Sequence, residues 1–293
     1  MDSLVRLPPH MVEQVRGFLD GTSTPVEPRN AATIVLLREG AAAEPGALQV
    51  YLLRRHLDMA FAGGMAVFPG GGVDPRDFDH AVAWVGPPPE EWATRMGVDV
   101  PLARALVCAA VRETFEESGV LFAGPTADSI VEDTTGPDWE NDRRRLEARE
   151  LSFTDFLAQR GLTLRADLLR VWGAWLTPVF EPRRYMTWFF VAELPPGQET
   201  RDVSTESDDV TWMPVREAIT AADREQMLVL PPQYVTFLEL FDHPTPRDAL
   251  AAAAGRDLQC IEPTGSVEGD QAYIALPEHL AELAAHVAGR MRP

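Results

Sequence analysis

Three carboxylates lie within five positions of one another in the segment AAVRETFEESGVLF, residues 109–122. Residues three and four apart share a face of a helix, so Glu113, Glu116 and Glu117 would be neighbours there. Without a partner they would repel one another, and burying an ionised carboxylate is costly. A hard cation such as Mg²⁺ or Mn²⁺ would resolve this conflict. The alternative is a solvated helix face that carries ordinary surface charges.

Two neighbouring features favour the metal interpretation. Arg112 can brace a carboxylate through its planar guanidinium group. The glycine-rich segment FPGGG, residues 68–72, would let backbone groups approach a phosphate or a metal closely. A glycine-rich turn followed by an acidic helix is typical of a site for a metal-bound phosphate, although the turn alone could be a plain tight loop.

Apolar patterns predict the elements that must position these residues. Strands are expected at residues 31–37, 48–55, 65–68, 171–180, 185–194 and 208–215, and the first two should form an antiparallel hairpin. The carboxylates belong to a helix with Pro101 near its start and Gly119 at its end. Residues 74–100 contain three consecutive prolines and predict an irregular excursion, whereas residues 138–170 favour helix. Further helices and a hairpin are expected towards the C-terminus.

Charge and composition exclude several classes of protein. The chain has 293 residues and a formal charge of −19, with 45 acidic against 26 basic residues, so it should repel nucleic acid and anionic membranes. No run of about 20 apolar residues predicts a membrane span. The two cysteines, Cys108 and Cys260, are far apart, which argues against a disulfide scaffold or a thiolate zinc site. With an N-terminus unlike a signal peptide, these features predict a cytoplasmic protein.

The glycine-rich turn and the acidic helix together resemble the Nudix box, Gly-x5-Glu-x7-Arg-Glu-U-x-Glu-Glu-x-Gly-U, where U is apolar. The second half of the pattern matches from Arg112 to Val120, and Gly71 matches the first glycine. An uninterrupted box would place the arginine at position 85, so 27 residues are inserted before it. The first glutamate of the box becomes Asp77 when counted from the glycine and Arg104 when counted from the helix.

The interruption resembles the branch of the family that includes the peroxisomal coenzyme A diphosphatases. The segments YLLRRHLDMAFAGGMAVFPGG and LTPVFEPRRYMTWFFVA extend that resemblance on both sides of the box. One position departs from it, because a motif associated with coenzyme A recognition expects an arginine where this chain has Ala60. The chain also ends without a peroxisomal Ser-Lys-Leu.

The resemblance implies an α/β (α+β) fold, the Nudix-type α/β/α sandwich around a mixed sheet. We expect a single domain over residues 1–293, with its core at about 30–220. The additions to that core are an insertion in the box at about 74–100, a helical insertion at about 125–170, and a C-terminal helical extension at about 221–293. The last helices would form either a homodimer surface or a lid, and a separate helical subdomain is the alternative arrangement.

The resemblance further implies metal-dependent hydrolysis of a diphosphate linkage in a small nucleotide-type molecule. The branch suggests coenzyme A or acyl-coenzyme A as substrate, giving 4'-phosphopantetheine and 3',5'-ADP. Nucleoside diphosphate sugars, dinucleotides and nucleoside triphosphates are the alternative substrates. A regulatory module without turnover is a third hypothesis, but such modules typically lose one of the glutamates that this chain retains.

Site residues follow from the match to the box. Glu116 and Glu117 would be the principal ligands of Mg²⁺ or Mn²⁺, and Glu113 would be a further ligand or the base that orients water. Arg112 would position Glu113. A backbone carbonyl of Gly70 or Gly71 would complete the coordination.

Residues outside the box are expected to contribute as well. Glu206 is the candidate for an additional carboxylate, acting as ligand or general base, with Asp208 and Glu181 as competitors. Two arginine pairs are the candidates for binding the anionic substrate: Arg54, Arg55, Arg183 and Arg184. The aromatic run Trp188–Phe190 favours core packing over base stacking.

Overall fold

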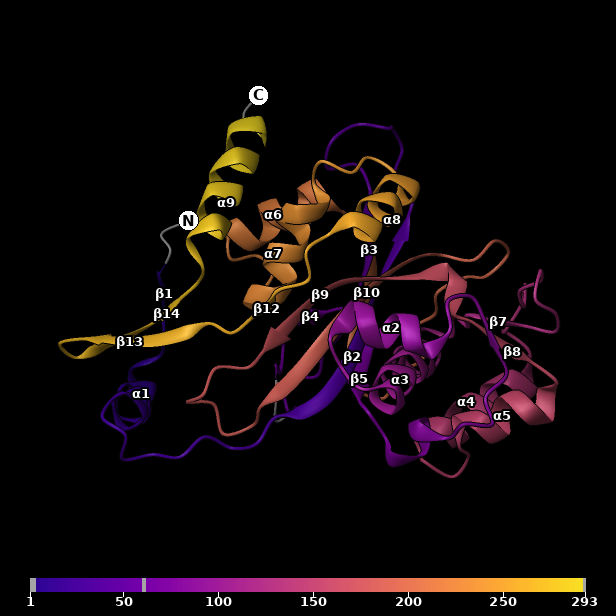
Figure 1. Ribbon diagram of the computed structural model, residues 1–293. Coiled ribbons are helices and arrows are strands. Elements are labelled where there is room, and N and C mark those ends of the chain that lie inside the picture. The colour runs from indigo at the N-terminus through magenta and orange to yellow at the C-terminus, as the bar shows by residue number, and fades with distance from the viewer. Residues whose placement is uncertain (1–3, 60–61, 292–293) are drawn as a thin grey trace.

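The computed structural model describes residues 4–59 and 62–291 (Figure 1). Ala60 and Phe61, two positions in the expected resemblance, lie outside the described residues. Within the described part, no helix combines the length and the apolar character that crossing a membrane requires. Both cysteines are free, Cys108 in the core and Cys260 at the surface.

A mixed sheet of eight strands occupies the centre of the described chain. Its main path runs β11-β3-β2-β10-β9-β12, with short β4 on β3 and short β5 on β2. Strands β2 and β3 form the expected antiparallel hairpin, and β10 runs parallel to β2. The strands are β2 (Arg29–Arg38), β3 (Gln49–Arg55), β4 (Ala66–Val67), β5 (Gly70–Gly72), β9 (Leu169–Leu176), β10 (Tyr185–Glu193), β11 (Ser207–Pro214) and β12 (Cys260–Ile261).

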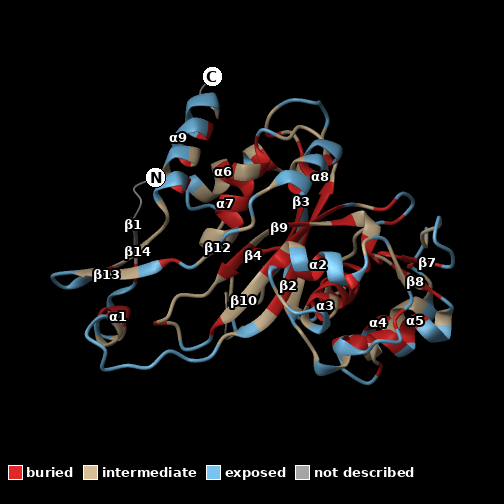
Figure 2. Ribbon diagram, viewed as in Figure 1, coloured by how far each residue is buried: buried red, intermediate tan, exposed pale blue. Residues whose placement is uncertain are grey.

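Helices cover both faces of this sheet. Alternation along β2 sends Ala32, Ile34 and Leu36 into one core and Val35 and Leu37 into the other. The first core lies under α2 (Pro89–Met96) and α3 (Val100–Ser118). The second lies under α6 (Val215–Asp223), α7 (Pro231–Leu240), α8 (Pro246–Gly255) and α9 (Glu278–Met291). Figure 2 shows the buried strands between these layers, which confirms the predicted α/β/α sandwich.

The glycine-rich segment is a strand rather than the predicted turn. Residues Gly70–Gly72 pair with Ala31–Thr33 of β2, in antiparallel register. Glycine suits position 70 because the backbone of β2 approaches it closely: an added Cβ at Gly70 would lie 2.6 Å from the carbonyl oxygen of Ala32.

The insertion at 74–100 is more regular than expected. It contains a short 3-10 helix, η2 (Pro75–Phe78), the strand β6 (Trp84–Val85) and the full helix α2. The proline run was expected to break structure, but Pro89 stands in the first turn of α2, where a missing N–H costs nothing. Trp92 and Met96 then pack into the core beside α3.

The segment at 125–170 is helical only in part. It begins after β7 (Ala123–Gly124) and contains α4 (Pro137–Glu147) and α5 (Phe153–Arg160), followed by β8 (Thr163–Arg165) and η3 (Ala166–Leu168). Strand β8 joins β6 and β7 in a small second sheet. The two insertions are therefore connected to each other by backbone hydrogen bonds.

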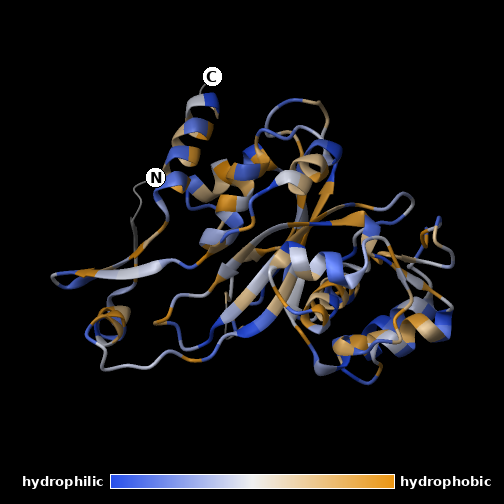
Figure 3. Cartoon of the chain, in the orientation of Figure 1, coloured by the Kyte–Doolittle hydropathy of each residue, from blue (hydrophilic) through white to orange (hydrophobic). Residues whose placement is uncertain are grey.

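The N-terminal segment and a hairpin near the C-terminus form a third sheet with its own small core. Strands β13 (Thr264–Glu268) and β14 (Gln271–Ala275) make the expected C-terminal hairpin, and β1 (Leu4–Arg6) adds to its edge. Helix α1 (Val12–Leu19), preceded by η1 (Pro9–Met11), packs on this sheet. Figure 3 shows hydrophobic residues alternating with hydrophilic ones along α9, as the amphipathic pattern predicts. The C-terminal extension thus contains strands as well as helices.

Gly119 ends α3 in the left-handed conformation, with φ of 76°. This conformation costs a residue with a side chain about 1–2 kcal/mol, and an added Cβ would also lie 2.5 Å from Nη2 of Arg201, so Gly119→Ala should lower the free energy of unfolding by at least that amount. Urea denaturation measures the change. Gly173→Ala is the control, because an added Cβ there meets no atom within 4 Å and its φ is negative. Equal stability of the two variants would contradict this account of the helix end.

Candidate active site

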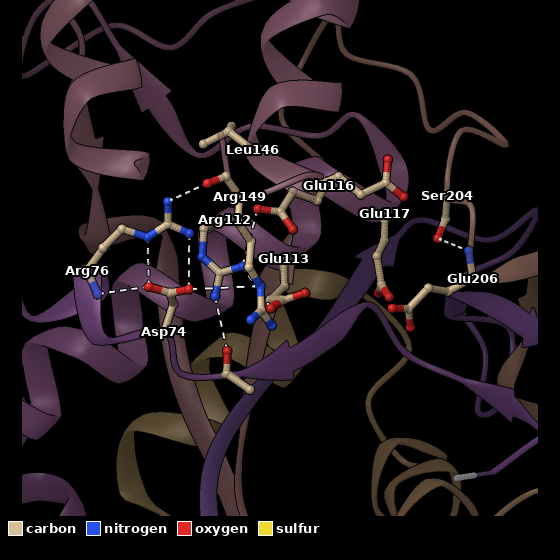
Figure 4. Close-up of a pocket in the computed structure, with 12 residues that line it drawn as sticks. Asp74, Arg76, Arg112, Glu113, Glu116, Glu117, Leu146, Arg149, Ser204 and Glu206 are labelled. Atoms are coloured by element: carbon tan, nitrogen blue, oxygen red, sulfur yellow. Dashed lines mark hydrogen bonds and ion pairs between the residues drawn. The ribbon is translucent and has the colours of Figure 1, made fainter. Parts of the chain in front are cut away.

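The three glutamates of the acidic helix lie together at one cavity. Glu113, Glu116 and Glu117, in the last turns of α3, line a cavity of about 90 Å³ with Arg112 (Figure 4). The helix is buried along most of its length, and its C-terminal part packs against the glycine strand β5. The carboxylates therefore lie beside that strand. The structure therefore brings together the residues that the sequence singled out in the box.

Arg112 is the centre of the ion pairs at this cavity. Its Nη1 donates to Glu113 Oε1 (2.8 Å) and to Glu116 Oε1 (3.2 Å). Its Nε and Nη2 bind both carboxylate oxygens of Asp77, at 3.0 and 2.9 Å, and Nη2 also donates to the carbonyl of Gly72 (3.1 Å). Arg112 thus holds the η2 segment and the glycine strand as well as Glu113.

The glycine strand meets the acidic helix through two close contacts. The N–H of Gly70 donates to Glu117 Oε2 at 2.8 Å. A Cβ added at Gly71 would lie 2.5 Å from the carboxyl carbon of Glu113, so a side chain there would displace that carboxylate. The approach of the Glu113 carboxylate thus explains the glycine at position 71, whereas the glycine at position 70 is explained by its neighbours on β2.

The cavity carries an excess of buried negative charge. Burial raises the pKa of Glu116 to about 8, and the charge of Glu113 adds to the effect. Burial also raises the pKa of Glu113, and it raises that of Glu117 well above its usual value. Arg112 faces these carboxylates and Asp77 together, and a further cation beside them would favour their full ionisation.

The carboxylates form no ready-made metal cage in the described chain, where no three acidic, histidine or cysteine side chains converge on one point. The reason is that Arg112 holds Glu113 and Glu116, while the N–H of Gly70 holds Glu117. Their oxygen donors and their unbalanced charge nevertheless suit a hard divalent cation. The residues fit such an ion once the carboxylates turn from their present partners.

Glu206 lies at the same cavity, where its carboxyl group faces that of Glu117 (Figure 4). It pairs with Arg55 (Nη2–Oε2 2.8 Å), whose charge offsets only part of the burial that raises the pKa of Glu117. Its two competitors lie elsewhere: Asp208 pairs with Arg54 on β3, and Glu181 lines a second cavity described below.

The remaining predicted arginines do not reach the acidic cavity. Arg54 is exposed and lines neither cavity. Arg183 and Arg184 line a separate cavity of about 270 Å³. Arg184 is buried, donates to the carbonyls of Thr177 and Val26, and pairs with Glu262 (2.7 Å), so it ties three segments together.

A group of residues from the insertions, which no sequence pattern singled out, also lines the acidic cavity. Arg76 pairs with Asp74 (2.8 Å) and donates to the carbonyl of Arg149 (3.0 Å), and all three line the cavity (Figure 4). Arg149 has a positive φ of 59°, which is uncommon for a residue with a side chain. Asp77, which the count from Gly71 aligned with the first glutamate of the box, forms a capping box with Asp74. Nothing in the sequence indicates Arg149.

A larger cavity adjoins the acidic one. It has a volume of about 600 Å³, and it shares Gly72, Glu113, Arg149 and Glu206 with the acidic cavity. The carboxylates thus lie where a small charged cavity meets a large one.

Asp77 should be needed for stability because it neutralises a buried arginine. Asp77→Ala leaves Arg112 without its bidentate partner, and we expect the free energy of unfolding to fall by about 3 kcal/mol. Chemical denaturation measures this. Asp79→Ala is the matched control, since Asp79 is exposed and its carboxylate accepts one bond, from the N–H of Ala81, so its loss should cost about 0.5 kcal/mol or less. A similar cost for both would show that the buried pair adds nothing.

Known proteins resemble this chain in both sequence and structure. A family model described as the NUDT19 Nudix domain matches residues 90–240, about half of the chain. The chain is 28% identical to putative nudix hydrolase 7 of Caenorhabditis elegans over 205 residues, covering 70% of this chain and 58% of that protein's length. It is 26% identical to acyl-coenzyme A diphosphatase NUDT19 of Gallus gallus over 284 residues, covering 80% of this chain and 73% of that one.

A solved structure extends this likeness to the fold. The NUDIX hydrolase from Alicyclobacillus acidocaldarius superimposes with a TM-score of 0.64 at 28% identity, covering 77% of this chain and 96% of that one. The family model, the relatives and the fold agree with the box built around Arg112. This chain therefore belongs to the Nudix hydrolase family, in its NUDT19 branch, and is a hydrolase that acts on diphosphate bonds.

Proposed function

We propose that this enzyme hydrolyses the diphosphate linkage of coenzyme A or acyl-coenzyme A, giving 4'-phosphopantetheine and 3',5'-ADP. The observation that carries the proposal is the set of buried carboxylates where the small acidic cavity meets the large one. The relatives named acyl-coenzyme A diphosphatase support the choice of substrate.

The proposed site residues follow the contacts of the cavity. Glu116 and Glu117 are the principal ligands of Mg²⁺ or Mn²⁺, with the backbone of Gly71 beside them, and Glu113 is a further ligand or the base that orients water. Nudix hydrolases generally use divalent metal ions, and a bound cation supplies charge neutralisation and a water of lowered pKa. Arg112 holds Glu113 in place. Glu206 is the additional carboxylate.

Two arginines would supply the positive charge that binds the phosphates of the substrate. Arg55 stands beside Glu206 and the glycine strand, and Arg149 lies at the border of both cavities. Arg149 is largely exposed and has one long contact, its Nε 4.0 Å from Asp74, so its guanidinium can turn to a phosphate. In the reaction, water attacks one phosphorus, its bond to the bridging oxygen breaks, and the other phosphate leaves.

We further propose how the chain is organised. The 1–293 chain acts as one domain, in which the core at about 30–220 carries the chemistry and the insertions and the C-terminal extension shape the substrate site. We also propose that the protein is cytoplasmic and forms a homodimer. Its partners are small molecules rather than nucleic acid. Nucleoside diphosphate sugars, dinucleotides and nucleoside triphosphates are the alternative substrates, since Ala60 departs from the coenzyme A motif.

With Mg²⁺ or Mn²⁺, the enzyme should release 4'-phosphopantetheine and 3',5'-ADP from coenzyme A, as measured by chromatography and mass spectrometry. Replacing Glu116 and Glu117 together by Gln should lower kcat at least about a hundredfold, because metal stabilisation of the transition state is worth several kcal/mol. The matched control replaces Glu90 and Glu91 by Gln, an adjacent pair exposed on α2, and should keep full activity.

Several outcomes would count against the proposal. Activity that survives the Glu116 and Glu117 changes would move the site elsewhere, as would Mn²⁺ bound away from these residues in a soaked crystal. Faster hydrolysis of a nucleoside diphosphate sugar, a dinucleotide or a nucleoside triphosphate would assign the alternative substrate.

Gly71→Ala should lower the activity because it displaces the carboxylate of Glu113. The added methyl would lie 2.5 Å from the Glu113 carboxyl group and displace it, and a displacement of this size can cost about a hundredfold in kcat. Gly72→Ala places its methyl in the open cavity, with no atom within 4 Å, so any effect should appear in KM instead. Steady-state kinetics of both variants separate these effects. An unchanged kcat for Gly71→Ala would show that the position of Glu113 is not critical.

A further inference from the structure

The large cavity extends from the acidic site across the central sheet. Its floor includes a row of residues in register on neighbouring strands: Gly72 on β5, Ala31 on β2, Thr187 on β10 and Trp175 on β9. Residues opposite one another in register share a face of the sheet. Because neighbouring strands lie about 4.8 Å apart, this row spans about 14 Å. The cavity can therefore hold an extended group attached to a diphosphate.

Part of the lining of this cavity is apolar. The side chains of Met65, Val67, Phe68 and Phe189 contribute to it, and Leu230 lies beside them because its neighbour Val229 pairs with Ala66. Phe189 is buried at 3% exposure and packs edge-on against Phe68, so this part of the cavity is firmly built. Such a surface favours an uncharged chain over a sugar or a second phosphate.

The C-terminal extension supplies the wall that contains Gln233. This side chain is 7% exposed and lines the cavity, and within the described residues its Oε1 has no hydrogen-bond partner. A buried carbonyl oxygen without a partner is costly, so a ligand that donates to it would gain binding energy. Gln233 is preceded in α7 by Pro231 and Pro232, which lack N–H groups, so this helix start is poorly suited to binding an anion.

An acidic residue lies in the part of the cavity beyond Trp175. Glu181 lines it beside Pro178, and burial raises the pKa of its carboxyl group. His10 lies near this carboxyl group and its charge partly opposes the shift, but none of the described residues is placed to form an ion pair or a hydrogen bond with the carboxylate. A second anionic group of the substrate would be repelled here.

We propose that the large cavity binds the uncharged, amide-bearing arm of the substrate, with Gln233 as the residue that hydrogen-bonds this arm and Glu181 as the residue that excludes an anionic end. The inference rests on the proposed function, and it also sets the orientation of coenzyme A. The pantetheine arm, which carries two amides, occupies the large cavity, and the phosphorylated adenosine lies on the other side of the carboxylates.

Pantetheine itself is the probe, because it has the amides and lacks phosphate. Calorimetric titration should show that it binds the wild-type enzyme and the Glu116→Gln, Glu117→Gln double variant equally well. Gln233→Leu keeps the volume and removes the amide, so it should weaken binding about threefold to tenfold, the worth of one hydrogen bond. Gln226→Leu, the same change at an exposed position, should bind pantetheine as the wild type does.

Glu181 is tested with two acyl groups of similar length. The wild-type enzyme should have a higher kcat/KM for butyryl-coenzyme A than for succinyl-coenzyme A, which ends in a carboxylate. Glu181→Gln should reduce this preference about fivefold, as expected for the loss of one partly screened charge. Glu268→Gln, exposed on β13, should leave the preference unchanged.

The outcomes separate this inference from the proposed function. Pantetheine binding that depends on Gln233, without hydrolysis of coenzyme A, would uphold the cavity and overturn the activity. Hydrolysis of coenzyme A with pantetheine binding that is absent, or that is the same in Gln233→Leu, would overturn the cavity assignment. A preference between the two acyl groups that Glu181→Gln does not change would overturn the role of Glu181.

Discussion

The structure depends on one buried guanidinium that holds together parts of the chain distant in sequence. Arg112 binds the carboxylates of Asp77, Glu113 and Glu116 and the carbonyl of Gly72. Its position fixes the acidic end of α3 against the glycine strand and the start of the first insertion. Burial of so many carboxylates beside one cation is expensive, and a protein retains such an arrangement where the charge is used.

The 27-residue interruption of the box does not separate its two halves in space. Strand β5 is held on β2, and its glycines contact the carboxylates of α3 directly. The intervening chain leaves after Gly72, contributes Asp77 to Arg112, and returns through α2 into α3. The insertion thus adds Asp74, Arg76 and Asp77 around a site that the ordinary box already forms.

Much of this could be predicted because the signals were local. The apolar runs of β2 and β3, and the Pro101 and Gly119 that punctuate α3, depend on neighbours in sequence. The spacing of Glu113, Glu116 and Glu117 likewise predicted their shared face. The strand conformation of Gly70–Gly72 was missed because it depends on pairing with β2, which no local pattern reveals.

The positions of the arginines show the same limit. Arg54 and Arg55 are adjacent, yet strand alternation sends them to opposite faces, and Arg55 is the one at the cavity. Arg184 forms an ion pair with Glu262 of the C-terminal extension, which lies 78 residues away in sequence. Arg149 reaches the site through a left-handed backbone, and the large cavity needs the extension to close it. Such features exist only after the chain has assembled.

The small sheet β6-β8-β7 has a consequence for how this protein can change. Strand β6 belongs to the first insertion, and β8, the central strand of that sheet, belongs to the second. Shortening the first insertion to restore an uninterrupted box would leave β8 with an open edge, and the buried Leu164 on it would lose its cover. The two insertions therefore behave as one module, which an engineer would have to remove, or transplant onto a simpler relative, as a whole.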